Sequence, residues 1–201
     1  MFIQVIQGRC NDPDRMRQLT EEWRAQLGPT AEGWLGGTYG ITDDGEAVAV
    51  VRFDSREAAS RNSARPEQGE WWQQMEACFD GEVTVHDCDN AMLFLGGGSD
   101  EAGFVQVIQG RIDDPERFRH FMERPMDALH EVRPEIIGGT LAMEPDGWFV
   151  QTIAFRTEEE ARAGEQKQMP PEVRGEFEDT MAHVSDQRFL DLHRPWFASA
   201  G

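Results

Sequence analysis

The pattern of apolar and polar positions predicts the first two elements of the chain. Residues 2–9 alternate and are rich in Phe, Ile and Val, which is typical of a strand. Asp12-Pro13 then predicts a helix start, because Asp caps a helix well and Pro fits its first turn. Apolar residues follow at spacings of three and four and form one helical stripe that ends at Gly28-Pro29: Met16, Leu19, Trp23 and Leu27.

Further alternation predicts strands over 34–41 and 47–53, joined by a hairpin turn at Asp43-Asp44-Gly45. Ser55 is a natural N-cap for a second helix, which Pro66 breaks into two pieces. Residues 82–86 indicate a fourth strand, and 91–95 an additional one. The order β-α-β-β-α-β is that of the ferredoxin-like split βαβ unit.

The whole pattern occurs twice. Residues 2–9 return as residues 104–111, shifted by 102 positions and identical at seven of eight. Gly36-Gly37-Thr38 returns as Gly138-Gly139-Thr140 at the same shift, and the paired glycines predict either a bulge or a close approach of the backbone to another group. The second copy accordingly predicts a helix from Asp114-Pro115 to Pro134, strands over 136–143, 148–155 and 188–192, and a helix after Thr157 that breaks at Pro170-Pro171.

The duplication predicts an α+β fold of two domains. Residues 1–95 form the first ferredoxin-like repeat, 96–103 a Gly-rich linker, and 104–201 the second repeat. Such a sheet carries helices on one face only, and its other face must be covered. We therefore expect the two units to pack sheet to sheet, as an intramolecular dimeric α/β barrel. Internal pairing of this kind makes a monomer the expected state.

Charge narrows the partners. The chain has 38 Asp and Glu against 19 Lys and Arg, a net charge of −19, whereas nucleic acids and anionic membranes attract basic surfaces. We therefore expect neither nucleic acid nor an anionic membrane as a partner. The basic residues are Arg except for Lys167, a bias typical of GC-rich bacterial genomes. Three cysteines that do not recur, with no signal-peptide pattern, indicate a reducing cytoplasm.

Metal and cofactor motifs are weak. His86 and Cys88 alternate with Asp87 and Asp89 on a predicted strand, so the two pairs face opposite ways. The paired spacings that mark zinc sites do not occur, nor does a phosphate-binding glycine loop. We expect no metal and no cofactor.

The run Gly33-Trp34-Leu35-Gly36-Gly37-Thr38-Tyr39, followed by Asp44-Gly45 and by residues 50–58, Val-Val-Arg-Phe-Asp-Ser-Arg-Glu-Ala, is familiar. It resembles the antibiotic-biosynthesis monooxygenase family of the dimeric α/β-barrel superfamily, in both halves of the chain. That resemblance implies a pocket between sheet and helices within one unit. It also implies an activity like that of the family's cofactor-free oxygenases of polyketide quinone precursors.

The resemblance places two family positions on the third strand of each copy. Where the oxygenases carry an Asn and a Trp, this chain has Ala49 and Phe53 in the first copy and Gln151 and Phe155 in the second. Only the second copy keeps an amide there. The resemblance therefore implies that Gln151 orients a phenol or enol and that Gln106 assists. The substrate-binding candidates are apolar or amide residues of both copies: Phe155, Trp148, Phe118, Met122, Phe53, Trp72 and Asn62.

Other interpretations of these residues stay open. Gln106, like Gln4 in the first copy, shares a face with apolar neighbours and could serve the sheet rather than a ligand. Aromatic residues at helical spacing commonly pack in a core. The chain could thus be an oxygenase of an aromatic or polyketide-like molecule, or a non-catalytic binding or stress-related module on the same fold. Haem binding is a third hypothesis, although the Asn, Trp and His set of haem-degrading relatives is not assembled in either half.

Overall fold

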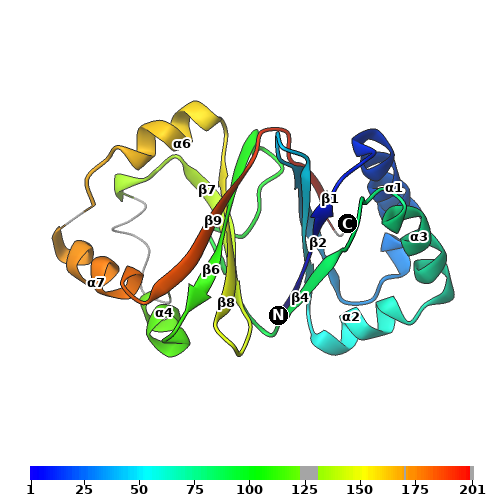
Figure 1. Ribbon diagram of the computed structural model, residues 1–201, viewed down its shortest axis with the longest axis horizontal. Helices are drawn as coiled ribbons and strands as arrows, with labels where there is room; N and C mark the ends of the chain where they lie inside the picture. The colour runs from blue at the N-terminus through cyan, green and yellow to red at the C-terminus, as the bar shows by residue number, and fades with distance from the viewer. Residues whose placement is uncertain (123–130, 170, 200–201) are drawn as a thin grey trace. The chain divides into compact units, whose positions relative to one another are not determined.

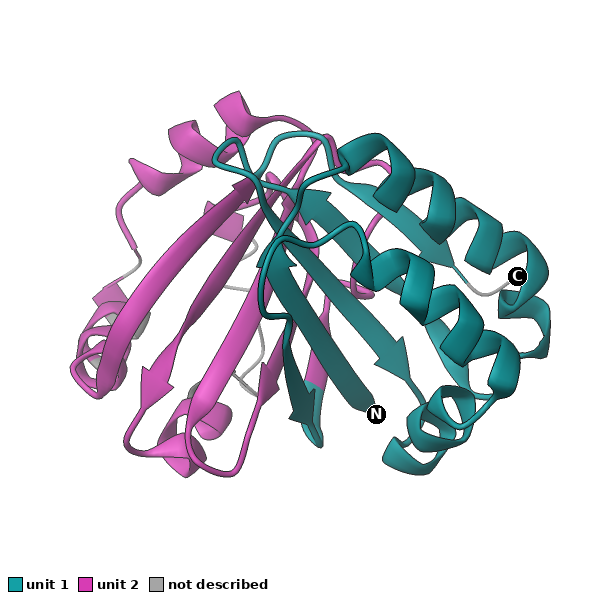
Figure 2. Cartoon of the chain, turned by 45° about the vertical axis from the view of Figure 1, so that its right-hand side comes forward, with its two compact units in different colours: residues 1–91, 192–201 teal, residues 92–191 magenta. Residues whose placement is uncertain are grey.

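The computed structural model describes residues 1–122, 131–169 and 171–199. It contains two compact units, which are coloured separately in Figure 2. Unit 1 consists of residues 1–91 and 192–201, and unit 2 of residues 92–191. Each unit has a five-stranded sheet with its helices on one face (Figure 1). The α+β class and the tandem ferredoxin-like organisation that the sequence predicts are confirmed.

Unit 1 follows the predicted element order closely. Its elements are β1 (Phe2–Arg9), α1 (Pro13–Gln26), the 3-10 helix η1 (Gly28–Thr30), β2 (Trp34–Ile41), β3 (Glu46–Phe53), α2 (Arg56–Ser63), α3 (Pro66–Glu76), β4 (Thr84–Cys88) and β10 (Trp196–Ser199). The hydrogen-bonded strand order is β10-β2-β3-β1-β4. The predicted caps are present, since Asp12 accepts a hydrogen bond from the Arg15 amide and Ser55 from the Ala58 amide.

Unit 2 repeats this arrangement. Its elements are β5 (Asn90–Phe94), β6 (Phe104–Ile112), α4 (Pro115–Met122), β7 (Ile136–Met143), β8 (Trp148–Phe155), α6 (Glu158–Glu165), α7 (Pro171–Met181) and β9 (Val184–Leu192). The strand order is β5-β7-β8-β6-β9. The helix predicted from Asp114-Pro115 to Pro134 begins as expected at α4. Its continuation over 123–130 lies outside the described residues.

The two sheets exchange their fifth strands. β5 follows β4 along the chain but pairs with β7, and β10 follows β9 but pairs with β2. The strand predicted near 91–95 therefore exists, whereas β10 was not predicted. As a result, the compact units cross the boundaries of the sequence repeats.

Two strand boundaries differ from the prediction. β4 begins at Thr84 rather than at residue 82, because Gly81 has a φ of 92° and the chain is still turning there. β9 begins at Val184, four residues before the predicted start, because α7 already ends at Met181. The predicted bulge is confirmed: the pairing register with the neighbouring strand shifts between Trp34 and Gly36, and Gly36 has a φ of 125° that favours glycine.

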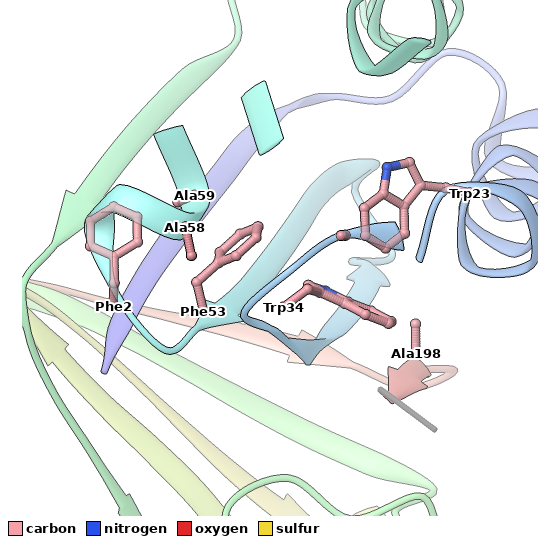
Figure 3. Packing of buried hydrophobic residues seen from close by; sticks show 8 residues of the cluster. Phe2, Trp23, Trp34, Phe53, Ala58, Ala59 and Ala198 are labelled. Atoms are coloured by element: carbon pink, nitrogen blue, oxygen red, sulfur yellow. The ribbon is translucent and has the colours of Figure 1, made fainter. Parts of the chain in front are cut away.

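Buried apolar side chains lie between the sheet and the helices of unit 1. Figure 3 shows one cluster, in which Trp23 of α1 meets Trp34 of β2 edge to face with ring centroids 4.8 Å apart. Phe2 and Phe53 pack nearby against Ala58 and the rest of this cluster. Among residues 1–122, 131–169 and 171–199, no helix combines the length and apolar character that crossing a bilayer requires.

Candidate functional site

Unit 1 contains a cavity of about 330 Å³ between its sheet and its helices. Residues of α1, α2 and α3 line it on one side and residues of all five strands on the other. Its volume falls within the range of small-molecule sites. All of its lining residues belong to unit 1.

The floor of the cavity is one transverse row of side chains. Cross-strand partners run Val85, Ile6, Ala49, Tyr39 and Trp196, over β4, β1, β3, β2 and β10 in turn. Paired residues of neighbouring strands project from the same face of a sheet. All five line the cavity, so the register itself builds the floor.

A small residue at the centre of this row makes the space. Ala49 sits on the middle strand beneath the helices, yet its side chain is only half-buried because nothing fills the volume above it. The equivalent residue of unit 2 is Gln151, which pairs with Ile108 and Leu141. One step along the same face, Ala47 of unit 1 corresponds to Phe149, whose ring packs 5.0 Å from that of Phe118.

The walls are aromatic. Of the six tryptophans in the chain, five line this cavity: Trp23, Trp34, Trp71, Trp72 and Trp196. Hydrogen bonds fix two of them, because the Trp71 indole N–H donates to the Leu19 carbonyl at 2.8 Å and that of Trp23 to Gln68 Oε1 at 2.6 Å. The walls can therefore hold a flat ligand by ring contacts in fixed orientations.

Tyr39 is the single ionisable group of the lining. No carboxylate, imidazole, amine, guanidinium or thiol occurs among the cavity residues. Its ring stacks on Trp196, with centroids 6.1 Å apart and planes 14° apart. Burial raises the pKa of Tyr39, against a smaller opposing effect of the Arg52 charge. The phenol thus stays protonated at neutral pH and can donate a hydrogen bond.

The absence of a side chain at Gly37 leaves room for the Tyr39 ring. A Cβ atom at residue 37 would lie 2.4 Å from the Tyr39 hydroxyl and 2.6 Å from Cζ, so only glycine leaves room there. The duplicated Gly139 serves the same purpose for a different ring, since a Cβ there would lie 2.0 Å from Cζ of Phe94. The repeated Gly-Gly pair therefore accommodates an aromatic ring in both units, but a phenol only in unit 1.

Two amides add donors on the helix side. The Asn62 carbonyl oxygen accepts a hydrogen bond from Arg65 Nη1 at 3.0 Å, and the Gln68 carbonyl oxygen accepts from Trp23. These bonds leave the amide nitrogens for other partners, and neither nitrogen has one among the residues that the structure describes. Both residues line the cavity.

The candidates that the sequence names in the first copy come together. Phe53, Trp72 and Asn62 all line the cavity of unit 1. Asn62 is buried at the end of α2, just before the break at Pro66. Ala49, at the family position for a polar residue, is the middle of the floor. Its contribution in this copy is the space that its small side chain leaves.

The candidates in the second copy are more dispersed. Gln106, Gln151 and Phe155 lie on the helix-facing side of the unit 2 sheet. Gln106 pairs with Ile153, which projects from the same face of β8 as Gln151 and Phe155. Phe155 and Phe118 are buried in two separate apolar clusters. Trp148 alternates with Phe149 and so faces away from Gln151. Met122 ends α4, and its side chain lies outside the described part.

The amide of Gln106 is engaged within the protein. Its Nε2 donates to Asp191 and to Glu165, each at 3.3 Å. Gln4 makes the equivalent bond to Asp87 at 2.9 Å in unit 1. The same hydrogen bond in both copies supports a structural role for these glutamines, which link β1 to β4 in unit 1 and β6 to β9 in unit 2.

An arginine of the second helix also binds the same aspartate in each unit. Arg56 binds Asp87 and Asp89 and lies 4.8 Å over the Phe2 ring. Arg162 binds Asp191 and lies 5.4 Å over the Phe104 ring. The predicted common face of Asp87 and Asp89 is therefore used to bind a guanidinium from the second helix.

Sequence reasoning missed Tyr39, Ala49 as empty space, and the gathering of tryptophans. Signals for each were present. Tyr39 is the one tyrosine of the chain, and Leu141 replaces it in the second copy. Trp23, Trp71 and Trp196 likewise have no tryptophan at their repeat positions. A comparison of side-chain size between the copies would have located the cavity in unit 1.

No protein-family model and no curated protein matches this chain. Solved structures do match it over its whole length. A candidate monooxygenase from Lactobacillus acidophilus is 16% identical with a TM-score of 0.76, covering 100% of this chain and 96% of the other. An anthrone oxidase-like protein is 13% identical with a TM-score of 0.63, covering 100% and 93%.

A third match comes from Listeria monocytogenes. This ferredoxin-fold protein related to antibiotic-biosynthesis monooxygenases is 10% identical with a TM-score of 0.50, covering 96% of this chain and 94% of the other. At sequence identities this low, the structural similarity shows the fold alone. The chain therefore has the two-unit ferredoxin-like fold found among proteins related to the antibiotic-biosynthesis monooxygenases.

Proposed function

We propose that the chain binds an uncharged aromatic or polyketide-like small molecule in the cavity of unit 1 and acts on it as a cofactor-independent monooxygenase. The observation that carries this proposal is the lining: five indole rings and Phe53 surround a space with no charged side chain. Such walls favour flat apolar rings, and burying an ionic ligand there without a partner would be costly.

The reaction would rest on the substrate's own acidity. The neutral phenol or enol would bind and then lose a proton to a water molecule, giving a transient electron-rich anion that reacts with dioxygen. In an anthrone-type substrate the ring CH₂ becomes C=O, one oxygen atom enters the product, and the other leaves as water. The cavity would contribute orientation and the exclusion of bulk water, which are established sources of rate enhancement.

A non-catalytic binding module is the second candidate. It is favoured by one observation, the lack of a carboxylate or imidazole among the cavity residues that could act as a general base. The chemistry and the binding can be separated because each has its own signal. Five of the six tryptophans line the cavity, so a bound aromatic ketone should quench most of the indole fluorescence.

The test is to incubate the purified chain with anthrone in an oxygen electrode and to titrate it separately with a stable aromatic ketone. Oxygen uptake above the uncatalysed rate together with quenching supports the monooxygenase. Quenching without uptake rejects it and assigns the binding module. An absence of both rejects the proposal as a whole.

Unit 2 remains a second place to look. Gln151 lies at the centre of the row that corresponds to the floor in unit 1, and we propose it as the polar contact of any ligand there, with Gln106 held beside it. Separate Gln151→Ala and Ala49→Leu variants assign activity to a unit. Loss in the first alone would place the function in unit 2, against our proposal.

A further inference from the structure

Three polar side chains of the unit 1 cavity are linked to one of its apolar clusters. The lining divides between two apolar clusters, one formed around Phe2, Trp34 and Phe53 and the other around Met16 and Met75. Tyr39 packs against the first cluster. Asn62 belongs to the same helix as Ala58 and Ala59, which are members of that cluster. Gln68 is bonded to Trp23, another member. Three polar side chains are thus tied to the first cluster, and the other polar residues of the lining are Gln4, Thr20 and Ser63.

These three side chains offer donors in particular. The carbonyl oxygens of Asn62 and Gln68 already accept hydrogen bonds from Arg65 and Trp23, and an indole N–H can only donate, which fixes the Gln68 amide orientation. Their amide nitrogens are left. The Tyr39 hydroxyl has no hydrogen-bond partner among the residues described. Burial keeps that hydroxyl protonated, so it too has a proton to donate.

We infer that Tyr39, Asn62 and Gln68 hold the ligand of this cavity by donating hydrogen bonds to carbonyl or similar acceptor oxygens, and that Tyr39 determines specificity for them. This inference rests on the proposed function for the location and aromatic character of the ligand. The ligand class becomes narrower: an uncharged aromatic ketone or quinone, bound with its oxygen toward Tyr39.

A cationic aromatic ligand is the competing class. Indole faces attract cations, and the chain carries a net charge of −19. Beside Tyr39, Asn62 and Gln68, however, a cation would meet amide and hydroxyl protons, and the lining contains no carboxylate. The donor set therefore selects an acceptor oxygen over a cation of the same shape.

The experiment compares planar three-ring probes by calorimetric titration of the full chain. The probes are fluorenone, which has a carbonyl oxygen; fluorene, which lacks it; and N-methylacridinium, which is cationic. We expect fluorenone to bind most tightly. Tyr39→Phe should weaken fluorenone about 3- to 10-fold, the usual effect of one hydrogen bond between neutral groups, and should leave fluorene unchanged.

Thr38→Val is the matched control. It removes a hydroxyl from the adjacent residue of the same strand, which projects from the opposite face, so fluorenone affinity should not change. Tyr39→Phe should also keep the thermal stability of the wild type, because the deleted hydroxyl has no internal partner to lose.

The outcomes separate the two proposals. If wild-type protein binds none of the probes, the proposed function fails and this inference with it. If fluorenone binds wild type and Tyr39→Phe equally, or binds no better than fluorene, the donor role of Tyr39 is overturned while aromatic binding stands. Preference for N-methylacridinium overturns the assignment to acceptor oxygens.

Discussion

Ala49→Leu should stabilise the protein while it weakens ligand binding, a combination expected only if the cavity is a binding site. Ala49 is half-buried at the centre of the floor, and the space above it is about 330 Å³. Filling cavities of natural proteins commonly adds about 0.5–2 kcal/mol of stability. Some of that gain is offset by displaced water and by rotamer restriction of the new side chain. We therefore expect an increase of about 1 kcal/mol in the free energy of unfolding.

Thermal and chemical denaturation measure this change. A gain of about 1 kcal/mol corresponds to roughly 2–4 °C in Tm for a chain of this size. Titration with fluorenone measures the other effect, since the leucine occupies the centre of the ligand volume. Affinity should fall at least about tenfold, which is about 1.4 kcal/mol of binding free energy.

Val50→Leu provides the control on the neighbouring residue. Val50 projects from the opposite face of β3, is 2% exposed and is not among the residues that line the cavity. Enlarging a packed residue costs typically about 1–3 kcal/mol, so this variant should lose stability and keep its affinity. If Ala49→Leu is destabilised as much as Val50→Leu, or still binds fluorenone as tightly as wild type, the space above Ala49 is not a ligand site.

Three further predictions test the surroundings of the cavity. Gly37→Ala should weaken ligand binding, since its Cβ would lie 2.4 Å from the Tyr39 hydroxyl and displace the phenol; titration and denaturation should show a stability change of less than about 1 kcal/mol. Arg56→Gln should raise the pKa of Asp89, because hydrogen bonds from Arg56 lower it. Asp89 stabilises the fold above the pKa of the unfolded carboxyl and loses this effect as pH falls through its lower folded pKa; NMR titration of the carboxyl would show no upward shift if the pair were not formed. Trp148→Phe should leave quenching by a bound ketone intact, because Trp148 is the tryptophan outside the cavity lining; a loss of quenching in fluorescence titration would place the ligand elsewhere.

Local signals explain why most elements could be predicted. The strand and helix periods, the caps at Asp12 and Ser55 and the break at Pro66 all act within a few residues of themselves. The position of β10 could not be read in this way. Its four residues pair with Tyr39 and its neighbours, more than 150 positions away along the chain. The pairing of β10 with β2 is thus a long-range interaction that the local pattern of apolar and polar residues does not predict.

The same limit of local sequence signals explains why only some of the cavity residues were named from the sequence. Repeat alignment correctly equated Ala49 with Gln151, and the structure places both at the centre of their rows. The polar side chain of Gln151 favoured the second copy as the site. The cavity of unit 1 could not be predicted in this way, because its volume depends on the packing of several elements together. The Tyr39 phenol depends on Gly37 two residues earlier, a relation of packing that the motif alone leaves unassigned.

The exchanged strand β10 also sets an order in time. Trp196 belongs to the cavity of unit 1, yet it lies more than 100 positions after β4, the preceding strand of that sheet. At a synthesis rate of about 5–20 residues per second, β2 would wait on the order of 8–30 s for its neighbour. During that interval its edge is open to pairing with any other strand. A cell making this protein would thus hold a nascent half-domain, one tryptophan short of its binding site, until translation of the second repeat was nearly complete.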